Sequence, residues 1–477
     1  MRMHGPAETH SVPFGDVLKH YRVAASLTQE ELAEGAGVSR LTISALERGV
    51  RHIPHKDTLR RLADALQLPE RDRDRLHRAA RKAVPGGGLQ APDHASVPSS
   101  LMSPPLTGRT RELDVIERHI EGEGPQLLVV AGEPGIGKTR LLREAEAYAL
   151  RYGFRVLHGD AQRRRIAERY APISEALAHH LYQQGPLQRR AIIRSFPWLV
   201  RLLPEFAGDL AEQLPTIPRD GEPRLMFEAA AEYLFAPDAD GSEPSLGTLL
   251  VLDDLQWAGP DTLELLTALV RKRPEGNGAP LRLIGAYRDT EVQLDDILPR
   301  ALADLVPGRL ATELTLGPLE PEAATQLLQT LMNKSKEGAS DLIQQQAGGI
   351  PFFLLGLSQA AGLGSQRIPR DLAQSVRSRV VTLPRDAREI LDLASLIGDE
   401  VSHELLLDVC DDSETMVAHA LDVLYRSKLL VATGDSSSRF ANHVIRAVVE
   451  QDIGNASRTL LRRRIDHARP DHGSSSG

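Results

Sequence analysis

The sequence predicts a multidomain chain in which a small all-α unit precedes an α/β unit built on a parallel sheet, with further helical segments after it. The length of 477 residues exceeds one ordinary core, since domains hold about 100–200 residues each. Between Phe14 and about Lys82, apolar positions recur at helical spacing. From Leu127 onward, short apolar runs alternate with helical patterns, as they do where helices cover a parallel sheet.

The composition is that of a globular, non-membrane protein, with 26% charged and 41% hydrophobic residues and a formal net charge of −8. The longest apolar runs have only the length of strands, and the start MRMHGPAETH lacks an apolar leader. The single cysteine, Cys410, excludes an internal disulfide and a multi-cysteine metal site. We therefore expect a cytoplasmic protein without a membrane partner.

The most informative stretch is Leu127–Leu142, LLVVAGEPGIGKTRLL, in which an apolar strand leads through a glycine-rich turn into a helix. It matches G-x-x-x-x-G-K-[ST], the phosphate-binding loop. The glycines let backbone N–H groups face an anion, the lysine adds a positive charge, and the hydroxyl reaches Mg²⁺. The sequence therefore predicts a site for ATP or ADP with Mg²⁺, formed by Glu133, Pro134, Gly135, Ile136, Gly137, Lys138, Thr139 and Arg140.

Acidic residues follow a second apolar strand, because Thr248–Leu252 ends in Asp253 and Asp254. Mg²⁺ prefers oxygen ligands, so we expect Asp253 to hold the metal together with Thr139, and Asp254 to orient or deprotonate the attacking water. Acid pairs are also common on solvated surfaces. The position at the end of a buried strand is what favours the catalytic interpretation.

A third apolar strand, Leu281–Tyr287, ends in Arg288 and Asp289. In a parallel sheet this arginine would lie beside the strand of Asp253. We predict that Arg288 senses the γ-phosphate, with a plain surface arginine as the alternative.

The N-terminal segment contains two short helices joined by a glycine-containing turn. Thr28 and Glu31 form a capping box before QEELAEGA, and after the turn at Gly37 a second helix runs from Ser39 to Gly49. This arrangement predicts a helix-turn-helix, whose second helix can enter the major groove of DNA.

The segment LTQEELAEGAGVSRLTISALERG, followed by TLRRLADALQL, resembles the Cro/repressor-type DNA-binding domain. That resemblance implies that double-stranded DNA is contacted, at the bases or phosphates and at the backbone, by Ser39, Arg40, Thr42, Ser44, Thr28 and Gln29. Arg40 is the best base reader, because its guanidinium can pair with guanine O6 and N7. The alternative is a protein-interaction module of the same fold, with Leu46 and Leu62 in its core.

The larger unit resembles the AAA-like ATPases of the STAND class, which are signal-transduction ATPases with numerous domains. The matching segments are LTGRTREL, GEPGIGKTR, VLDDLQWAGPDT, GAYRDTEV, GGIPFFL and RFANHVIRAVV. By this resemblance, Gly108 and Arg109 hold the adenine and ribose side, Pro351 presses on the base, and His443 touches the β-phosphate of ADP. The related motif is Met-His-Asp, whereas Asn442 and Val444 flank the histidine here. A helix cap or a core group is the alternative role for His443.

The predicted domains follow from these segments and from composition. They are a helix-turn-helix domain at 1–83, a Pro/Gly/Ser-rich linker at 84–105, a P-loop ATPase core at 106–317, a helical lid at 318–368, a winged-helix domain at 369–466 and a disordered tail at 467–477. DNA binding by the winged helix ranks low, since that region is acidic. STAND proteins usually continue into helical repeats, and this sequence shows no 34-residue period.

Together these features predict an ATP-dependent, DNA-binding transcriptional regulator in which the ADP or ATP state controls conformation and self-association. Hydrolysis is expected to be slow, and a protein or small-molecule effector is a further expected partner. The alternative is a conflict or defence switch whose N-terminal domain is a protein-interaction adaptor. A metabolic or transport ATPase ranks below both.

Overall fold

A computed structural model of the chain separates into two compact units, residues 1–102 and 103–477. In the first unit the structure describes residues 18–19, 21–22, 25, 27–36, 43, 62–63, 65–66 and 73. In the second it describes residues 106–468 without 164–165, 167, 209–213, 216–220, 237–244, 274–278, 294, 333–336, 366, 411–413 and 435.

In the N-terminal unit, helix α2 spans Gln29–Ala36, the predicted QEELAEGA. Its capping box forms as predicted, because the Thr28 amide donates to Glu31 Oε2 at 2.7 Å and the Glu31 amide donates to Thr28 Oγ1 at 3.2 Å. These bonds lower the pKa of Glu31. Leu18, Leu32, Ile43 and Leu62 are fully buried in one cluster. The rest of the predicted helix Ser39–Gly49, including Leu46, and the predicted linker 84–105 lie outside the described residues.

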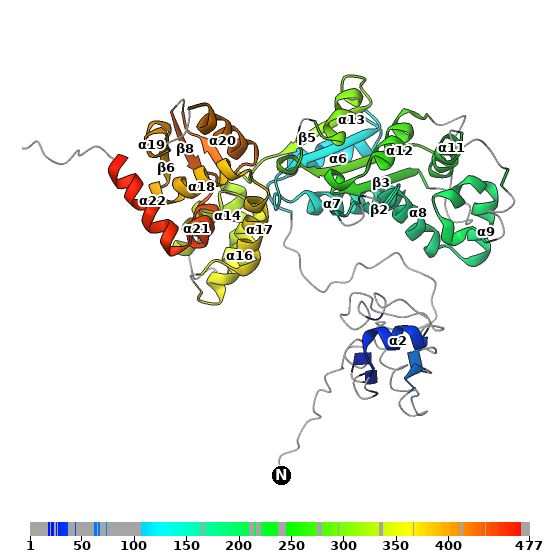
Figure 1. The fold of residues 1–477 in the computed structure, drawn as a ribbon. Helices are drawn as coiled ribbons and strands as arrows, with labels where there is room; N and C mark the ends of the chain where they lie inside the picture. The colour runs from blue at the N-terminus through cyan, green and yellow to red at the C-terminus, as the bar shows by residue number, and fades with distance from the viewer. Residues whose placement is uncertain are drawn as a thin grey trace, which may run out of the picture. The chain divides into compact units, whose positions relative to one another are not determined.

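The second unit is organised around a five-stranded sheet in the order β2-β3-β4-β1-β5, in which every neighbouring pair is parallel (Figure 1). Its strands are β1 Leu127–Gly132, β2 Phe154–Asp160, β3 Gly247–Asp253, β4 Leu281–Arg288 and β5 Ala311–Leu316. The three strands predicted to carry site residues are therefore adjacent, and their carboxyl ends meet at one edge of the sheet.

Alternate residues of each strand point to opposite faces, so both faces of the sheet are covered by helices. Leu128 and Val130 pack in one core with the helices α6 Thr110–Ile120 and α7 Lys138–Tyr152. Leu127 and Val129 pack in a second core with α8 Ala171–Gln183, α11 Glu222–Phe235, α12 Pro260–Arg271 and α13 Ile297–Leu305. The predicted three-layer α/β architecture is confirmed.

Prolines begin several of the helical segments between β2 and β3, as proline is tolerated in a first helical turn. Pro186 starts α9, Pro186–Ser195, and two 3₁₀ turns begin at prolines, η2 Pro197–Arg201 and η3 Pro204–Phe206. Further 3₁₀ turns follow β3 and β4 directly, as η4 Leu255–Trp257 and η5 Asp289–Glu291.

Three helices follow the sheet where helical spacing predicts a lid, namely α14 Pro321–Leu331, α15 Glu337–Ala347 and α16 Pro351–Gly362. The turn before α16 needs two glycines, because Gly348 and Gly349 have φ angles of 60° and 75°. A Cβ on Gly349 would lie 2.7 Å from the carbonyl oxygen of Leu319. This close approach fixes the start of α16 against the segment that leaves β5.

In its described residues, the C-terminal segment combines six helices with a three-stranded antiparallel sheet in the order β6-β8-β7. Within this sheet β8 pairs with both β6 and β7. The winged-helix assignment stays a prediction. The predicted boundary between this domain and the tail, at residue 467, falls inside α22, which ends at Ala468. The elements are α17 Arg370–Val381, α18 Arg385–Ile397, β6 Glu400–Ser402, α19 His403–Val409, α20 Glu414–Arg426, β7 Leu430–Ala432, β8 Ser437–Phe440, α21 His443–Asp452 and α22 Asn455–Ala468.

One continuous apolar core joins the sheet, the lid and the C-terminal segment. It contains Ile116 of α6, Val130 of β1, Leu328 of α14, Leu391 of α18 and Ile465 of α22. Cys410, the single cysteine of the sequence, is buried in this core. None of the described helices combines the length and the apolar character needed to cross a bilayer.

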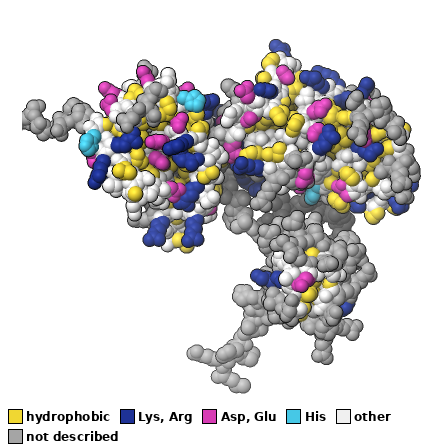
Figure 2. Space-filling view, in the orientation of Figure 1, with side chains coloured by type: hydrophobic (Ala, Val, Ile, Leu, Met, Phe, Trp, Pro, Cys, Tyr) yellow, Lys and Arg dark blue, Asp and Glu magenta, His cyan; other side chains and the backbone are white. Residues whose placement is uncertain are grey.

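Basic and acidic side chains lie next to one another on the visible face of the C-terminal segment (Figure 2). Arg377 and Asp452 form a bidentate ion pair with both contacts at 2.7 Å, and Arg446 pairs with Asp399. These two pairs neutralise part of the positive charge of this segment, which agrees with the low rank given to DNA binding by it.

The packing of β2 against α8 predicts a strong effect of Gly159→Ala. A Cβ at Gly159 would lie 1.9 Å from the carbonyl oxygen of Pro172, so backbone must move. We expect about 1–3 kcal/mol of destabilisation, measured as a lower denaturation midpoint. The matched variant Gly362→Ala lies in a helix with nothing within 4 Å of the new Cβ and should be neutral or slightly stabilising. Equal midpoints for the two variants would contradict this account.

Candidate active site

The phosphate loop joins β1 to α7, the context that the motif predicts. Gly135 and Gly137 have φ angles of 81° and 106°, which glycine adopts without strain. Gly137 is the residue that precedes α7, so the free N–H groups of the first helical turn are directed at this loop. The loop is therefore built to face an anion.

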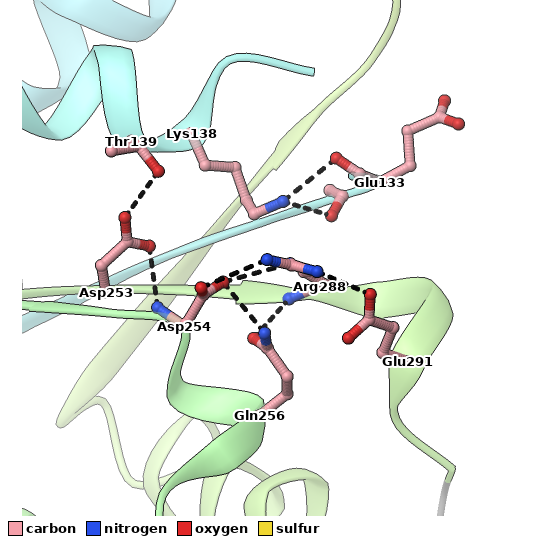
Figure 3. Close-up of polar contacts among 9 residues, drawn as sticks. Glu133, Lys138, Thr139, Asp253, Asp254, Gln256, Arg288 and Glu291 are labelled. Carbon is pink, nitrogen blue, oxygen red and sulfur yellow. Dashed lines mark hydrogen bonds and ion pairs between the residues drawn. The ribbon is translucent and has the colours of Figure 1, made fainter. Parts of the chain in front are cut away.

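Lys138 is buried and donates from Nζ to the carbonyl oxygens of Gly132 and Glu133, at 2.8 and 3.0 Å (Figure 3). Burial, together with the positive charge of Arg288, lowers the pKa of Lys138 to about 8. The ammonium group thus lies over the loop, held by neutral carbonyls that an anionic phosphate would outcompete.

Thr139 and Asp253 come together from α7 and β3, as the predicted metal site requires. Thr139 Oγ1 donates to Asp253 Oδ2 at 2.6 Å (Figure 3). Burial raises the pKa of Asp253, and the bond from Thr139 opposes that rise. A hydroxyl and a carboxylate side by side are a pair of oxygen ligands of the kind that Mg²⁺ prefers.

Asp254 and Arg288 form a bidentate ion pair, with Nε to Oδ1 at 3.1 Å and Nη2 to Oδ2 at 3.2 Å. The Gln256 side chain bonds to both partners. Its Nε2 donates to Asp254 Oδ1 at 2.9 Å, and its Oε1 accepts from the backbone N–H of Arg288 at 3.0 Å. Glu291 accepts from Arg288 Nη1 at 2.8 Å. Figure 3 shows this network beside Lys138. Sequence reasoning missed Gln256 and Glu291, although Gln256 lies within the segment VLDDLQW.

A cavity of about 500 Å³ opens at this edge of the sheet. Its lining combines charged side chains, among them Lys138, Asp254 and Arg288, with apolar ones. The described residues that line it are Leu106, Thr107, Arg109, Pro134, Gly135, Ile136, Gly137, Lys138, Thr139, Arg140, Arg143, Asp254, Arg288, Leu319, Leu327, Pro351, Phe352, Leu355 and Ser375. Most of the predicted cofactor-binding residues are therefore brought together.

The lid contributes more to the cavity than the single predicted residue Pro351. Phe352 donates its backbone N–H to the carbonyl oxygen of Gly135 at 3.2 Å, and a Cβ on Gly135 would lie 2.7 Å from Phe352. Leu319, Leu327 and Phe352 supply the apolar lining. The sequence does not show that these three side chains line a cavity, because apolar residues are ordinarily core residues.

Arg109 lines the cavity, but its guanidinium group is bonded to the protein. It donates to the carbonyl oxygens of Gly317 and Ile136 at 2.6 and 3.3 Å and pairs with Glu112 at 2.9 Å. Gly108 is not among the lining residues and packs on the lid, where a Cβ would lie 2.2 Å from Ala323. Ligand contacts by these two residues stay predictions.

The described lining residues include neither Glu133 nor His443. The Glu133 side chain points away from Lys138 (Figure 3). His443 begins α21 and its Nδ1 lies 3.5 Å from Asp399 Oδ1, while Asn442 caps the helix through the Ile445 amide. Neither a phosphate contact by His443 nor its predicted alternative as a helix cap is supported by these contacts.

Of the residues predicted to contact DNA, Thr28 and Gln29 are described and lie at the start of α2. Ser39, Arg40, Thr42 and Ser44 lie outside the described residues, so their role stays a prediction.

The sheet order, the phosphate loop and the acids at the end of β3 define a P-loop ATPase fold. Residues 105–284 match the family described as "AAA ATPase domain", and residues 13–76 match the family described as "Helix-turn-helix domain". The chain therefore joins a helix-turn-helix domain to an AAA ATPase domain.

Two curated relatives match different parts of the chain. An uncharacterized HTH-type transcriptional regulator, RghRB of Bacillus subtilis, is 42% identical over 57 residues, covering 12% of this chain and 41% of its own length. The uncharacterized protein R02095 of Rhizobium meliloti is 24% identical over 400 residues, covering 76% of this chain and 37% of its own. The chain thus spans about two fifths of the length of each relative.

Two solved structures are also similar. The Walker-type ATPase PABY2304 of Pyrococcus abyssi aligns over 72% of this chain and 96% of its own, with 15% identity and a TM-score of 0.45. A STAND protein with a tetratricopeptide repeat sensor, PH0952 of Pyrococcus horikoshii, aligns over 76% of this chain and 45% of its own, with 14% identity and a TM-score of 0.34.

The lowered pKa of Lys138 predicts a pH-dependent nucleotide affinity. Above a pH of about 8 the lysine of the free protein becomes neutral, so the affinity for ADP should fall as the pH rises, by up to about tenfold per pH unit. Calorimetric titration of ADP between pH 7 and pH 9.5 measures this. Lys138→Arg keeps its charge throughout and should flatten the profile. A parent profile as flat as that of the variant would contradict the prediction.

Proposed function

We propose that this protein is an ATP-dependent, DNA-binding transcriptional regulator, a STAND-like switch in which the ADP or ATP state controls conformation and self-association. The observation that carries the proposal is the cavity that brings together Lys138, Asp254 and Arg288. One end of that cavity suits phosphates, and the groups at that end can distinguish two phosphates from three.

The residues at the cavity fit a nucleotide and its metal. Leu319, Leu327 and Phe352 offer apolar contact to a base, while Lys138 and the amides of the phosphate loop meet the phosphates. Thr139 and Asp253 would hold Mg²⁺, which supplies positive charge to the phosphate oxygens when it is bound. The hydroxyl and carboxylate that now bond to one another are the groups that such an ion would use.

Arg288 provides a physical basis for distinguishing ATP from ADP. Its guanidinium group is paired with Asp254. A γ-phosphate is a stronger partner for a guanidinium group than one carboxylate, so ATP would draw Arg288 away from Asp254. ADP offers no γ-phosphate, and the ion pair would persist. The two nucleotides therefore favour different arrangements of β4 and the residues that follow it.

The same ion pair keeps Asp254 from acting as a base while no γ-phosphate is bound. Asp254 accepts bonds from Arg288 and Gln256, so its carboxylate is occupied and cannot orient water until Arg288 leaves. Asp254 also has a φ of 53°, a conformation that asparagine tolerates, which makes Asp254→Asn a conservative test.

Two substitutions separate binding from turnover. Lys138→Ala should reduce ATP and ADP affinity by at least about a hundredfold, because it removes the buried cation that faces the phosphates. Asp254→Asn should keep binding and lose turnover by about a hundredfold or more, since it removes the base. Equilibrium titration and phosphate release measure the two effects. Normal turnover in Asp254→Asn would remove Asp254 from the mechanism.

DNA binding is supported by the helix-turn-helix match and by the regulator that shares this segment. The segment from Phe14 to Lys82 also has fourteen Lys or Arg against ten Asp or Glu, in a chain of net charge −8. A local positive excess attracts the phosphate backbone of DNA.

Selection of duplexes from a random-sequence pool by the full chain tests this role. We expect an enriched motif whose affinity falls with salt concentration, and Arg40→Ala should weaken binding to it by about 1–3 kcal/mol. If no duplex is enriched at any salt concentration, the regulator assignment fails and a protein-interaction adaptor takes its place.

Self-association should depend on the nucleotide. Gel filtration of the full chain should show a larger species with a non-hydrolysable ATP analogue than with ADP, because only a γ-phosphate engages Arg288. Lys138→Ala should elute alike with both nucleotides. Identical elution of the parent chain with both, at every concentration, would contradict the switch.

A further inference from the structure

Two side chains of the C-terminal segment contact the residues that build the phosphate site. Arg379, on α17, lies with Nη2 4.0 Å from Glu133 Oε2. Lys428, between α20 and β7, donates from Nζ to Asp289 Oδ2 at 2.8 Å. Glu133 is part of the phosphate loop, and Asp289 directly follows Arg288. The C-terminal segment therefore reaches both halves of the site.

The Glu133–Arg379 pair is unusual in its burial, because each side chain is only 7% exposed. Within the described part of the chain, Glu133 Oε2 and Arg379 Nε have no hydrogen-bond partner. Arg379 Nη2 also donates to the carbonyl oxygens of Ser427 and Lys428, at 2.6 and 3.0 Å. Arg379 and Glu133 are one another's principal charged partners, while Lys428 and Asp289 also act on Glu133. Withdrawal of either side chain therefore leaves the other buried without its main counter-charge.

The two acidic partners, Glu133 and Asp289, each lie next to a group that would meet the phosphates. The backbone carbonyl of Glu133 accepts from Lys138 Nζ at 3.0 Å and from the Ile136 N–H at 3.3 Å, so the position of Glu133 sets the shape of the loop. Asp289 lies at the end of β4, where its neighbour Arg288 leaves the sheet. A displacement of either acidic residue would move Lys138 or Arg288.

We propose that Arg379 and Lys428 are positioning residues for the nucleotide site, and that their pairs with Glu133 and Asp289 couple nucleotide affinity to docking of the C-terminal segment on the ATPase core. This inference rests on the proposed nucleotide site and adds the groups that regulate it. Since the coupling of two equilibria is reciprocal, bound ADP must strengthen the docking as much as docking strengthens the binding of ADP.

The chain supplies matched controls for both side chains. Arg377 lies on the same helix as Arg379 and pairs with Asp452 on an exposed surface. Arg426 ends α20, two residues before Lys428, and donates to the Asp422 carbonyl oxygen. Loss of either arginine removes an equal charge, from the helix of Arg379 or from the helix just before Lys428, without touching the phosphate site.

The test uses the full chain and a fluorescent ADP. Arg379→Met should speed ADP dissociation about tenfold, and Lys428→Met several-fold, whereas Arg377→Met and Arg426→Met should stay within twofold of the parent. Glu133→Gln should resemble Arg379→Met. The double variant Glu133→Gln/Arg379→Met should be no worse than Arg379→Met alone, because the two changes remove one interaction.

Hydrogen exchange provides a readout that a purely structural role would not move. ADP should slow the exchange of α17 amides in the parent and in Arg377→Met, and should do so much less in Arg379→Met and Lys428→Met. Lys428 is partly exposed, so its variant remains informative even where Arg379→Met fails to fold.

The outcomes separate the inference from the function on which it rests. If the parent binds ADP, Lys138→Ala does not, and Lys428→Met and Arg379→Met release ADP as slowly as their controls, the inference is overturned and the proposed nucleotide site stands. If the parent binds no nucleotide, both are overturned.

Discussion

The parallel hydrogen bonding of β1, β3 and β4 is the constraint on which the site depends. It aligns Gly132 with Arg288 across β1 and β4, and brings the end of β3 alongside. Because all three strands run in the same direction, their carboxyl ends deliver the phosphate loop, two carboxylates and a guanidinium group to one edge. A shift in the register of β4 by one residue would turn Arg288 to the opposite face of the sheet.

The charges at that edge are largely paired with one another. Arg288 is shared between Asp254 and Glu291, Lys138 is held by loop carbonyls, and Thr139 bonds to Asp253. Each of these groups would exchange its present partner for a phosphate or a metal. Binding of a ligand would therefore replace polar contacts within the protein by polar contacts of the same kind to the ligand.

The sequence predicted the parts of the site that short motifs encode. The phosphate loop, the acids after β3 and the arginine after β4 are each local patterns, and the structure places them on adjacent strands. β5 was missed because it is short and its middle residues are partly exposed, with the charged Glu313 among them. Glu133 was expected at the phosphates because of its place in the motif. Its side chain instead lies near the buried Arg379, which is far away in the sequence.

The contacts of Arg379 and Lys428 could not be predicted for the same reason. The helical period of α17 does place Arg379 on the buried face with Leu372 and Val376, and leaves Arg377 off it. That pattern gives no sign that the partner of Arg379 is Glu133, which lies far away in the chain. Arginine at a helix surface is ordinarily solvated, so the sequence favours the wrong expectation for the buried one. Long-range burial, rather than residue type, decides which of these charges takes part in the site.

The continuous core from Ile116 to Ile465 has a consequence for biosynthesis. The chain leaves the ribosome N-terminus first, so the lid helices are made before the helices α21 and α22 that complete their core. During that interval the part of their apolar surface that α21 and α22 cover stays exposed. Because Arg379 and Lys428 belong to the C-terminal segment, the candidate site gains all its contacts only after most of the described residues have been synthesised.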